Sequence, residues 1–171
     1  ISFISIMHSN NEVGTLQDIA QIVKVAGDIP VHSDCVQSFG KVELSFKELG
    51  LTAATISAHK IVGPLGVAAL ILKRGLDIEP ILHGGGQERD IRSGTFNAPS
   101  ILAFAAAATE SASQFKDRSV VVRKLKQSLV EVVKKNISDA WVNGDQANSL
   151  PGIVSITFPR SDSEGLLLLL D

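Results

Sequence analysis

Short apolar segments alternate with a helix-like segment in the first half of this chain, and this alternation most constrains its fold. The strand-like segments are residues 1–7, 29–32, 53–57, 67–72 and 153–158. Residues 16–26, between the first two, carry apolar side chains at the spacing of one helix face. A strand, a helix and a second strand in this order predict a βαβ unit with parallel strands. We therefore expect an α/β protein with a mainly parallel sheet clad by helices, whose strands, such as residues 67–72, are buried on both faces.

The second half of the chain is dominated by helical periodicity. Residues 101–115 and 121–133 have the pattern of long amphipathic helices that serve as scaffold. Their basic side chains are interpreted as a solvated outer face, not a nucleic-acid patch: Arg123, Lys124, Lys126 and Lys134. Residues 141–171 then show a turn at Asn143-Gly144, a strand, and a helix that starts near Asp162 or Ser163. We expect residues 1–135 to form part of a large domain with its connecting helices, and residues 136–171 to begin a smaller α+β domain.

Composition excludes several classes of function. Sixteen basic and eighteen acidic side chains leave a formal charge of −2, too small to attract nucleic acid or an anionic membrane. The longest apolar run, residues 166–170, is far shorter than the roughly 20 residues that span a bilayer. The single cysteine, Cys35, cannot form a disulfide within the chain, so a reducing, cytoplasmic location is expected. The chain lacks an initiator methionine and stops within an apolar helix, which predicts a fragment of a longer protein.

Polar side chains follow three of the predicted strands, at residues 10–12, 34–37 and 57–60. Because the carboxyl ends of parallel strands lie about 4.8 Å apart, these segments are expected to surround one small molecule. Lys60 would lie at the mouth of the sheet, where a neutral amine is nucleophilic toward an aldehyde. Asp34 would be able to hold a pyridine nitrogen protonated, so that the ring accepts electrons. Considered singly, Lys60 is more simply a solvated lysine and Asp34 a turn residue, and only their combination predicts chemistry.

Five short blocks carry a family resemblance: Asn11-Glu12-Val13-Gly14, His32-Ser33-Asp34-Cys35-Val36-Gln37-Ser38, Ser57-Ala58-His59-Lys60, Gly84-Gly85-Gly86-Gln87-Glu88 and Arg92-Ser93-Gly94-Thr95. In order and spacing they resemble cysteine desulfurases and selenocysteine lyases, which are pyridoxal-phosphate enzymes of the class-V aminotransferase superfamily. The resemblance covers most of residues 1–100. It implies the aspartate-aminotransferase-like fold (fold-type I), a homodimer, and the branch that serves iron–sulfur cluster assembly and tRNA thiolation.

The resemblance also implies roles around the cofactor, pyridoxal 5'-phosphate. Lys60 corresponds to the catalytic lysine that binds this cofactor as a Schiff base. Asp34 corresponds to the partner of the pyridinium nitrogen. Asn11 and Gln37 correspond to residues that contact the phenolic oxygen of the ring.

Further positions correspond to phosphate contacts. Ser57 and His59 match residues that bind the phosphate of the same subunit, and Thr95 matches one that reaches the phosphate of the neighbouring subunit. No metal site is expected, since no ligand spacing joins the histidines. Cys35 is interpreted as a buried small thiol.

The resemblance implies a cysteine desulfurase, which converts L-cysteine to L-alanine and a protein persulfide. Iron–sulfur scaffold or tRNA-thiolation proteins would accept the sulfur, without direct binding of nucleic acid or membrane. The sulfur-accepting cysteine and the arginine for the substrate carboxylate are expected outside this chain, so the piece alone is expected to be inactive. Three alternatives remain open: a selenocysteine lyase with selenocysteine as substrate, a class-V aminotransferase, and a non-catalytic dimerisation or binding module in which Lys60 is idle.

Overall fold

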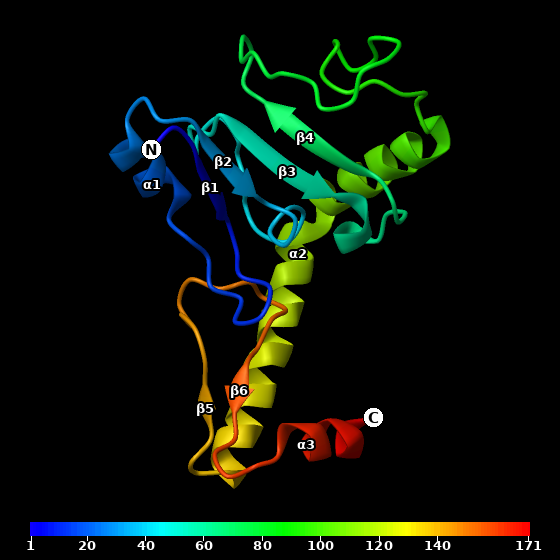
Figure 1. Cartoon of the computed structure of the whole chain (residues 1–171). Coiled ribbons are helices and arrows are strands. Elements are labelled where there is room, and N and C mark those ends of the chain that lie inside the picture. Colours follow the sequence, from blue (N-terminus) through cyan, green and yellow to red (C-terminus); the bar gives the residue numbers. More distant parts are fainter.

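A computed structural model describes all 171 residues of the chain. A small α/β body lies at one end, and a long helix extends from it to a second, smaller group of elements (Figure 1). The elements in chain order are β1 (Ile4–Met7), α1 (Ile19–Ala26), β2 (Val31–Asp34), β3 (Ala53–Ser57), the 3-10 helix η1 (Ala58–Ile61), β4 (Ala68–Leu72), α2 (Ala98–Asn136), β5 (Trp141–Val142), β6 (Ile156–Thr157) and α3 (Ser163–Leu170). None of the helices combines the length and the apolar composition needed to cross a bilayer.

The main sheet has four strands in the order β1-β2-β3-β4. β1 pairs parallel with β2, and β2 pairs parallel with β3, which confirms the predicted βαβ unit and the mainly parallel sheet. β4, however, runs antiparallel to β3 and exposes alternate residues, so the prediction of a parallel strand buried on both faces is wrong. Residues 58–67 link these two strands and are shorter than the dozen or so residues that a parallel crossover needs.

The first helix is shorter than its apolar pattern predicted. α1 begins at Ile19 because the Asp18 carboxylate caps it, accepting the N–H of Gln21 at 3.0 Å. Leu16 lies instead in a bridge with Ser9, opposite the end of β1. Ile19 is only 1% exposed, and burying such a side chain contributes about 1.5–3 kcal/mol to stability.

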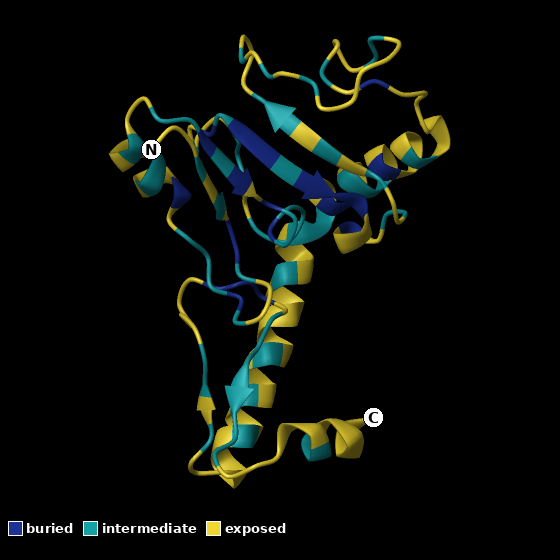
Figure 2. Ribbon diagram, in the orientation of Figure 1, coloured by how far each residue is buried: buried dark blue, intermediate teal, exposed yellow.

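The hydrophobic core lies on one face of the sheet. Its buried members are Ile19, Val31, Cys35, Leu51, Ala54, Ile56, Ala58, Ile61 and Phe104. Figure 2 shows the buried residues concentrated in β2, β3 and the adjoining turns. The opposite face carries exposed side chains, among them Met7, Asp34 and Leu70. The two faces therefore differ in role, with one packing against α1 and α2 and the other open.

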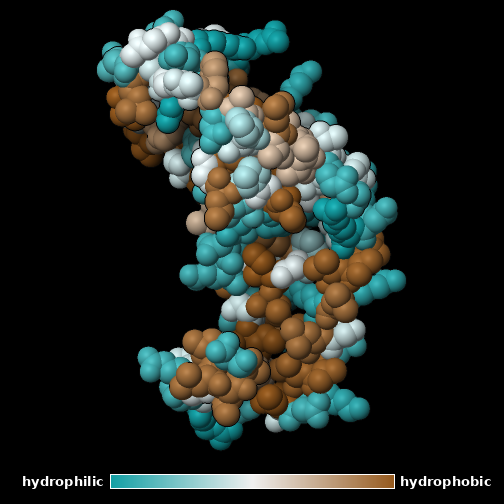
Figure 3. All heavy atoms as spheres, turned by 90° about the vertical axis from the view of Figure 1, so that its right-hand side faces the viewer, coloured by the Kyte–Doolittle hydropathy of each residue, from teal (hydrophilic) through white to brown (hydrophobic).

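α2 is one continuous helix of 39 residues, where two successive helices were predicted. Asn97 caps its start, Pro99 occupies its first turn, and no glycine or proline interrupts it afterwards. Beyond the sheet it exposes an apolar stripe of Val121, Leu125, Leu129 and Val132. Figure 3 shows apolar side chains gathered at the level of this part of α2 and of α3. The predicted amphipathic pattern is present, but its apolar stripe is left exposed in this chain.

Part of the segment between β5 and β6 packs against the loop that follows β1. The N–H of Leu16 donates to Asn148 O, and the N–H of Leu150 donates to Gly14 O, both at 2.8 Å. Lys126 Nζ donates to Ser149 Oγ at 3.0 Å, so the prediction of Lys126 on the solvated face of α2 is wrong. The predicted strand 153–158 is reduced to β6, which pairs with β5. A domain division after residue 135 stays a prediction.

Candidate functional site

The carboxyl ends of the parallel strands bring the predicted site segments to one edge of the sheet. Asp34, the last residue of β2, lies opposite Met7 of β1 and Thr55 of β3. Its side chain is exposed on the open face of the sheet. Asp34 Oδ1 accepts the N–H of Val36 at 2.9 Å, and Oδ2 has no partner within the chain. The structure therefore presents a carboxylate with one oxygen free to accept a hydrogen bond.

A polar bridge crosses the three strands two residues before Asp34. His32 Nδ1 lies 2.8 Å from Ser5 Oγ of β1, and His32 Nε2 lies 2.8 Å from Thr55 Oγ1 of β3. All three side chains share the face of Asp34, because alternate residues of a strand point the same way. This bridge ties β2 to both neighbours directly below the site. His32 was not among the predicted site residues, and the one signal for it in the sequence was its spacing of two from Asp34.

Lys60 lies in η1, the turn that follows β3. The buried residues Ala58 and Ile61 face the core, which turns His59 and Lys60 outward. No hydrogen bond or ion pair of the chain involves Lys60 Nζ. Ser57 Oγ lies 2.8 Å from His59 Nδ1, so these two predicted phosphate contacts are already joined. The turn presents an exposed amine beside a hydroxyl–imidazole pair.

A second lysine, which was not among the predicted site residues, lies beside these residues. Lys41 Nζ donates to Gln37 Oε1 at 3.2 Å. Burial, and secondly the positive charge of Lys60, lower the pKa of Lys41. The two amines are therefore close enough to interact electrostatically. The only signal in the sequence was the spacing of four residues between Gln37 and Lys41.

The two remaining predicted residues occupy exposed loops. Asn11 lies in the turn after β1, whose shape is held by Asn10 Oδ1 accepting the N–H groups of Glu12 and Val13 at 2.9 Å each. This turn belongs to the same edge of the sheet as Asp34. Thr95 lies in the loop between β4 and α2, is exposed, and makes no hydrogen bond in the chain. Within one chain, Thr95 is therefore not joined to the other six, and the roles of all seven stay predictions.

Two titratable side chains near the site face the core. Cys35 follows Asp34 directly but is 0% exposed, and burial raises the pKa of its thiol. His8 is 7% exposed, and burial lowers its pKa, so its ring is held neutral. A protonated, inaccessible thiol is a poor nucleophile. Neither side chain supplies reactive chemistry to the open face.

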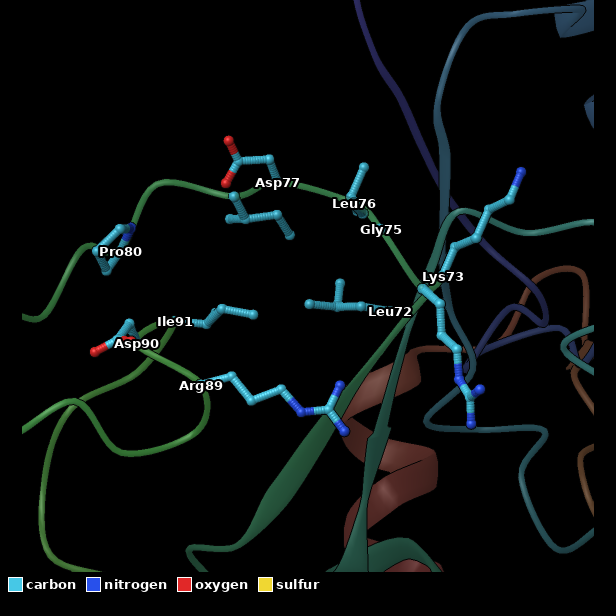
Figure 4. A pocket seen from close by; sticks show the side chains of 11 residues that line it. Leu72, Lys73, Gly75, Leu76, Asp77, Pro80, Arg89, Asp90 and Ile91 are labelled. Atoms are coloured by element: carbon cyan, nitrogen blue, oxygen red, sulfur yellow. The ribbon is translucent and has the colours of Figure 1, made fainter.

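A pocket of about 410 Å³ lies at the other end of the sheet, beyond Leu72 at the end of β4. In Figure 4, Leu72 and Ile91 face one another across it, and Arg89 reaches toward the strands. Because β4 is antiparallel, Leu72 lies opposite Ala53, at the start of β3. The pocket is thus separate from the edge that carries Asp34 and Lys60.

With this geometry established, the comparisons with known proteins identify the family. The family model for aminotransferase class-V matches residues 1–171, which is the whole chain. The chain belongs to the class-V aminotransferase family. This result confirms the family that the five sequence blocks predicted.

The curated relatives within this family carry more specific names. The IscS-like cysteine desulfurase of Mycobacterium tuberculosis is 41% identical over 174 residues, covering 100% of this chain. The cysteine desulfurase NifS of Azotobacter vinelandii is 36% identical over 173 residues, also covering 100% of the chain. The chain spans 44% and 43% of the length of these two proteins, which is less than half of each.

Solved structures confirm the predicted fold class. A NifS-like protein from Rickettsia africae superposes with a TM-score of 0.91 at 38% identity, covering 96% of this chain and 46% of that one. SspA, solved in complex with cysteine, superposes with a TM-score of 0.75 at 29% identity, covering 99% of this chain and 47% of that one. The four-stranded sheet and its helices are thus a part of the larger class-V fold.

Proposed function

We propose that this chain is the cofactor-binding part of a pyridoxal-phosphate-dependent cysteine desulfurase. The observation that carries the proposal is the juxtaposition of Lys60 and Asp34. The amine of Lys60, which has no partner, lies just after β3. The carboxylate of Asp34, which has one oxygen without a partner, lies at the end of the neighbouring parallel strand β2, at the same edge of the sheet. This is the edge at which α/β sheets bind small molecules.

The side chains at this edge suit the groups of pyridoxal phosphate. The free oxygen of Asp34 suits a ring N–H, and a charged acceptor strengthens that hydrogen bond. When Ser57 Oγ donates to His59 Nδ1, the ring Nε2 carries a hydrogen that it can donate to a phosphate oxygen. Lys60 has no competing partner for its amine. The donors and acceptors therefore fit the cofactor.

Each residue then has one task. Lys60 holds the cofactor covalently, and Asp34 keeps the ring nitrogen protonated. Asn11 and Gln37 bind the phenolic oxygen, while Ser57 and His59 bind the phosphate. Pyridoxal phosphate supplies an aldehyde that condenses with amines and a ring that accepts electrons from the substrate.

Thr95 is assigned to the phosphate of a second subunit in a homodimer. Its exposed loop, apart from the other six residues, supports a contact outside its own chain. Mixed dimers test this assignment. A dimer of one Lys60→Ala and one Thr95→Ala subunit would collect both lesions in one site and keep about half of the activity, whereas full activity of Thr95→Ala homodimers contradicts the assignment.

The proposed substrate is L-cysteine, which is converted to L-alanine while its sulfur passes to a protein persulfide. The names of the IscS-like and NifS relatives, and the cysteine in the SspA structure, support this choice. Cys35 is buried on the core face, so the proposed sulfur-accepting cysteine lies outside residues 1–171. Iron–sulfur scaffold or tRNA-thiolation proteins are proposed as final acceptors, in the cytoplasm.

Borohydride reduction of the full-length protein with bound cofactor tests the central assignment. The visible absorption band should disappear, and the reduced pyridoxyl label should be found by mass spectrometry on Lys60. Lys60→Ala serves as the control and should carry no label. A label on Lys41 or Lys73 in the wild-type protein refutes the assignment. With dithiothreitol present to reduce the persulfide, sulfide and alanine released in equal amounts from L-cysteine indicate desulfuration, whereas transamination would convert L-cysteine to 3-mercaptopyruvate and release no sulfide.

A further inference from the structure

Lys41 is held firmly beside the site by the packing of its own backbone. Ser119 Oγ of α2 donates to Lys41 O at 2.7 Å, and the N–H of Lys41 donates to Ser38 O at 3.0 Å. The preceding Gly40 has a φ of 69°, and a Cβ there would lie 2.8 Å from Ser111 Cβ of α2. The chain therefore passes against α2 at this point, and the Lys41 side chain turns back toward Gln37.

The hydrogen bond between these side chains has a defined polarity. An ammonium group offers three donors and no acceptor, so the Gln37 atom facing Lys41 Nζ is the amide oxygen. The Nε2 group of Gln37, with its two hydrogens, must then point away from Lys41. Both side chains are half-buried, and a hydrogen bond from a charged donor is stronger there than in water. Lys41 thus selects one of the two orientations of the Gln37 amide.

We propose that Lys41 is a positioning residue that aims the amide N–H donors of Gln37 at the phenolic oxygen of the bound cofactor. The inference rests on the proposed function, because it assigns Gln37 to that oxygen. The phenolic oxygen accepts hydrogen bonds, so only the donor end of the amide serves it. Without Lys41, the amide is free to rotate and to present its oxygen, which repels the phenolic oxygen.

The test compares two ligands that differ by one oxygen atom. Pyridoxal 5'-phosphate and 3-deoxypyridoxal 5'-phosphate, which lacks the phenolic oxygen, are titrated into the cofactor-free full-length protein. Absorbance gives the dissociation constant of each. The variants are Lys41→Met, which removes the donor at similar length, and Lys41→Arg, which keeps a charged donor. Lys47→Met is the matched control, since Lys47 is an exposed lysine of the same segment whose side chain makes no hydrogen bond.

Lys41→Met should weaken binding of pyridoxal 5'-phosphate by about three- to tenfold, which corresponds to one misdirected hydrogen bond. Binding of the 3-deoxy ligand should change by less than about twofold, and Lys41→Arg should recover most of the loss. In a Gln37→Leu background, Lys41→Met should have no further effect on either ligand. Lys47→Met should leave both dissociation constants unchanged.

Equal weakening for both ligands overturns the proposal, because Lys41 would then act through general charge or stability. A full effect of Lys41→Met in the Gln37→Leu background also overturns it, since Lys41 would then act directly. Failure of the proposed function looks different. In that case wild-type protein would form no visible absorption band with pyridoxal 5'-phosphate and no label on Lys60.

Discussion

Replacing Gly63 by alanine should destabilise the turn that carries Lys60. The added Cβ would lie 2.8 Å from Ala58 Cβ and 2.9 Å from Ala58 O, whereas non-bonded carbons pack at about 3.5–4.0 Å. Ala58 is 0% exposed, so it cannot move aside without disturbing the core. A shift of Gly63 would also stretch its hydrogen bond to Ala58 O, now 2.9 Å. Overpacking at about 1–3 kcal/mol and a weakened bond at about 0.5–1.5 kcal/mol together predict a loss of about 1.5–4.5 kcal/mol.

Urea unfolding of the full-length protein, followed by circular dichroism, measures this loss in the free energy of unfolding. Gly152→Ala is the matched control. Its added Cβ would meet only Val122 Cγ1, at 3.2 Å, and that side chain is 36% exposed, so it can shift by the few tenths of an ångström that the contact requires. The control should therefore lose less than about 1 kcal/mol. Gly63→Ala should also weaken cofactor binding, because a displaced turn moves Lys60. Unchanged stability together with unchanged cofactor binding would refute the reasoning that this close contact sets the position of Lys60.

Three further predictions concern neighbouring residues. Val62→Gly should raise the free energy of unfolding by about 0.5–1 kcal/mol. Val62 is a β-branched residue with a φ of 65°, which strains its backbone, and its side chain is 94% exposed, so its removal loses little packing. An unchanged or lower melting temperature contradicts this prediction. Burial raises the pKa of Cys35, so its contribution to stability is present at neutral pH and is lost as the pH rises above about 8.5, where the unfolded thiol ionises. Cys35→Ala should lose less stability than the wild-type protein between about pH 7 and pH 10 in urea unfolding, and an equal loss would show that other groups cause it. Asp34→Ala should lower cysteine turnover by about 10- to 100-fold, which corresponds to the loss of one charge-assisted hydrogen bond, and should affect cofactor affinity less. Normal turnover by the cofactor-bound fraction would contradict the proposed role of Asp34.

The elements that the sequence predicted well are those that depend on patterns among residues close together in the chain. The alternation of strand, helix and strand was enough to predict the parallel pairing of β1 and β2. The start of α3 was predicted near Asp162 or Ser163, and the helix begins at Ser163 because the Asp162 carboxylate caps it, accepting the N–H of Gly165 at 2.9 Å. The convergence of residues 34–37 and 57–60 at one edge followed from the geometry of any parallel sheet. These features depend on local chemistry, so the order of residues suffices for them.

Other features depend on contacts between residues that are far apart in the chain. Ser119 reaches Lys41 across 78 residues, and Asp145 donates its N–H to Thr15 across 130. No local pattern signals such contacts, because burial and packing choose the partner only once the chain has folded. For this reason Lys126 was predicted to be solvated, although its Nζ donates to Ser149 Oγ, and Lys41 was not among the predicted site residues, although its backbone oxygen accepts from Ser119 of α2. The type of site was therefore readable from the order of residues, whereas the position of the Lys41 backbone beside it came from the packing of α2 against this segment.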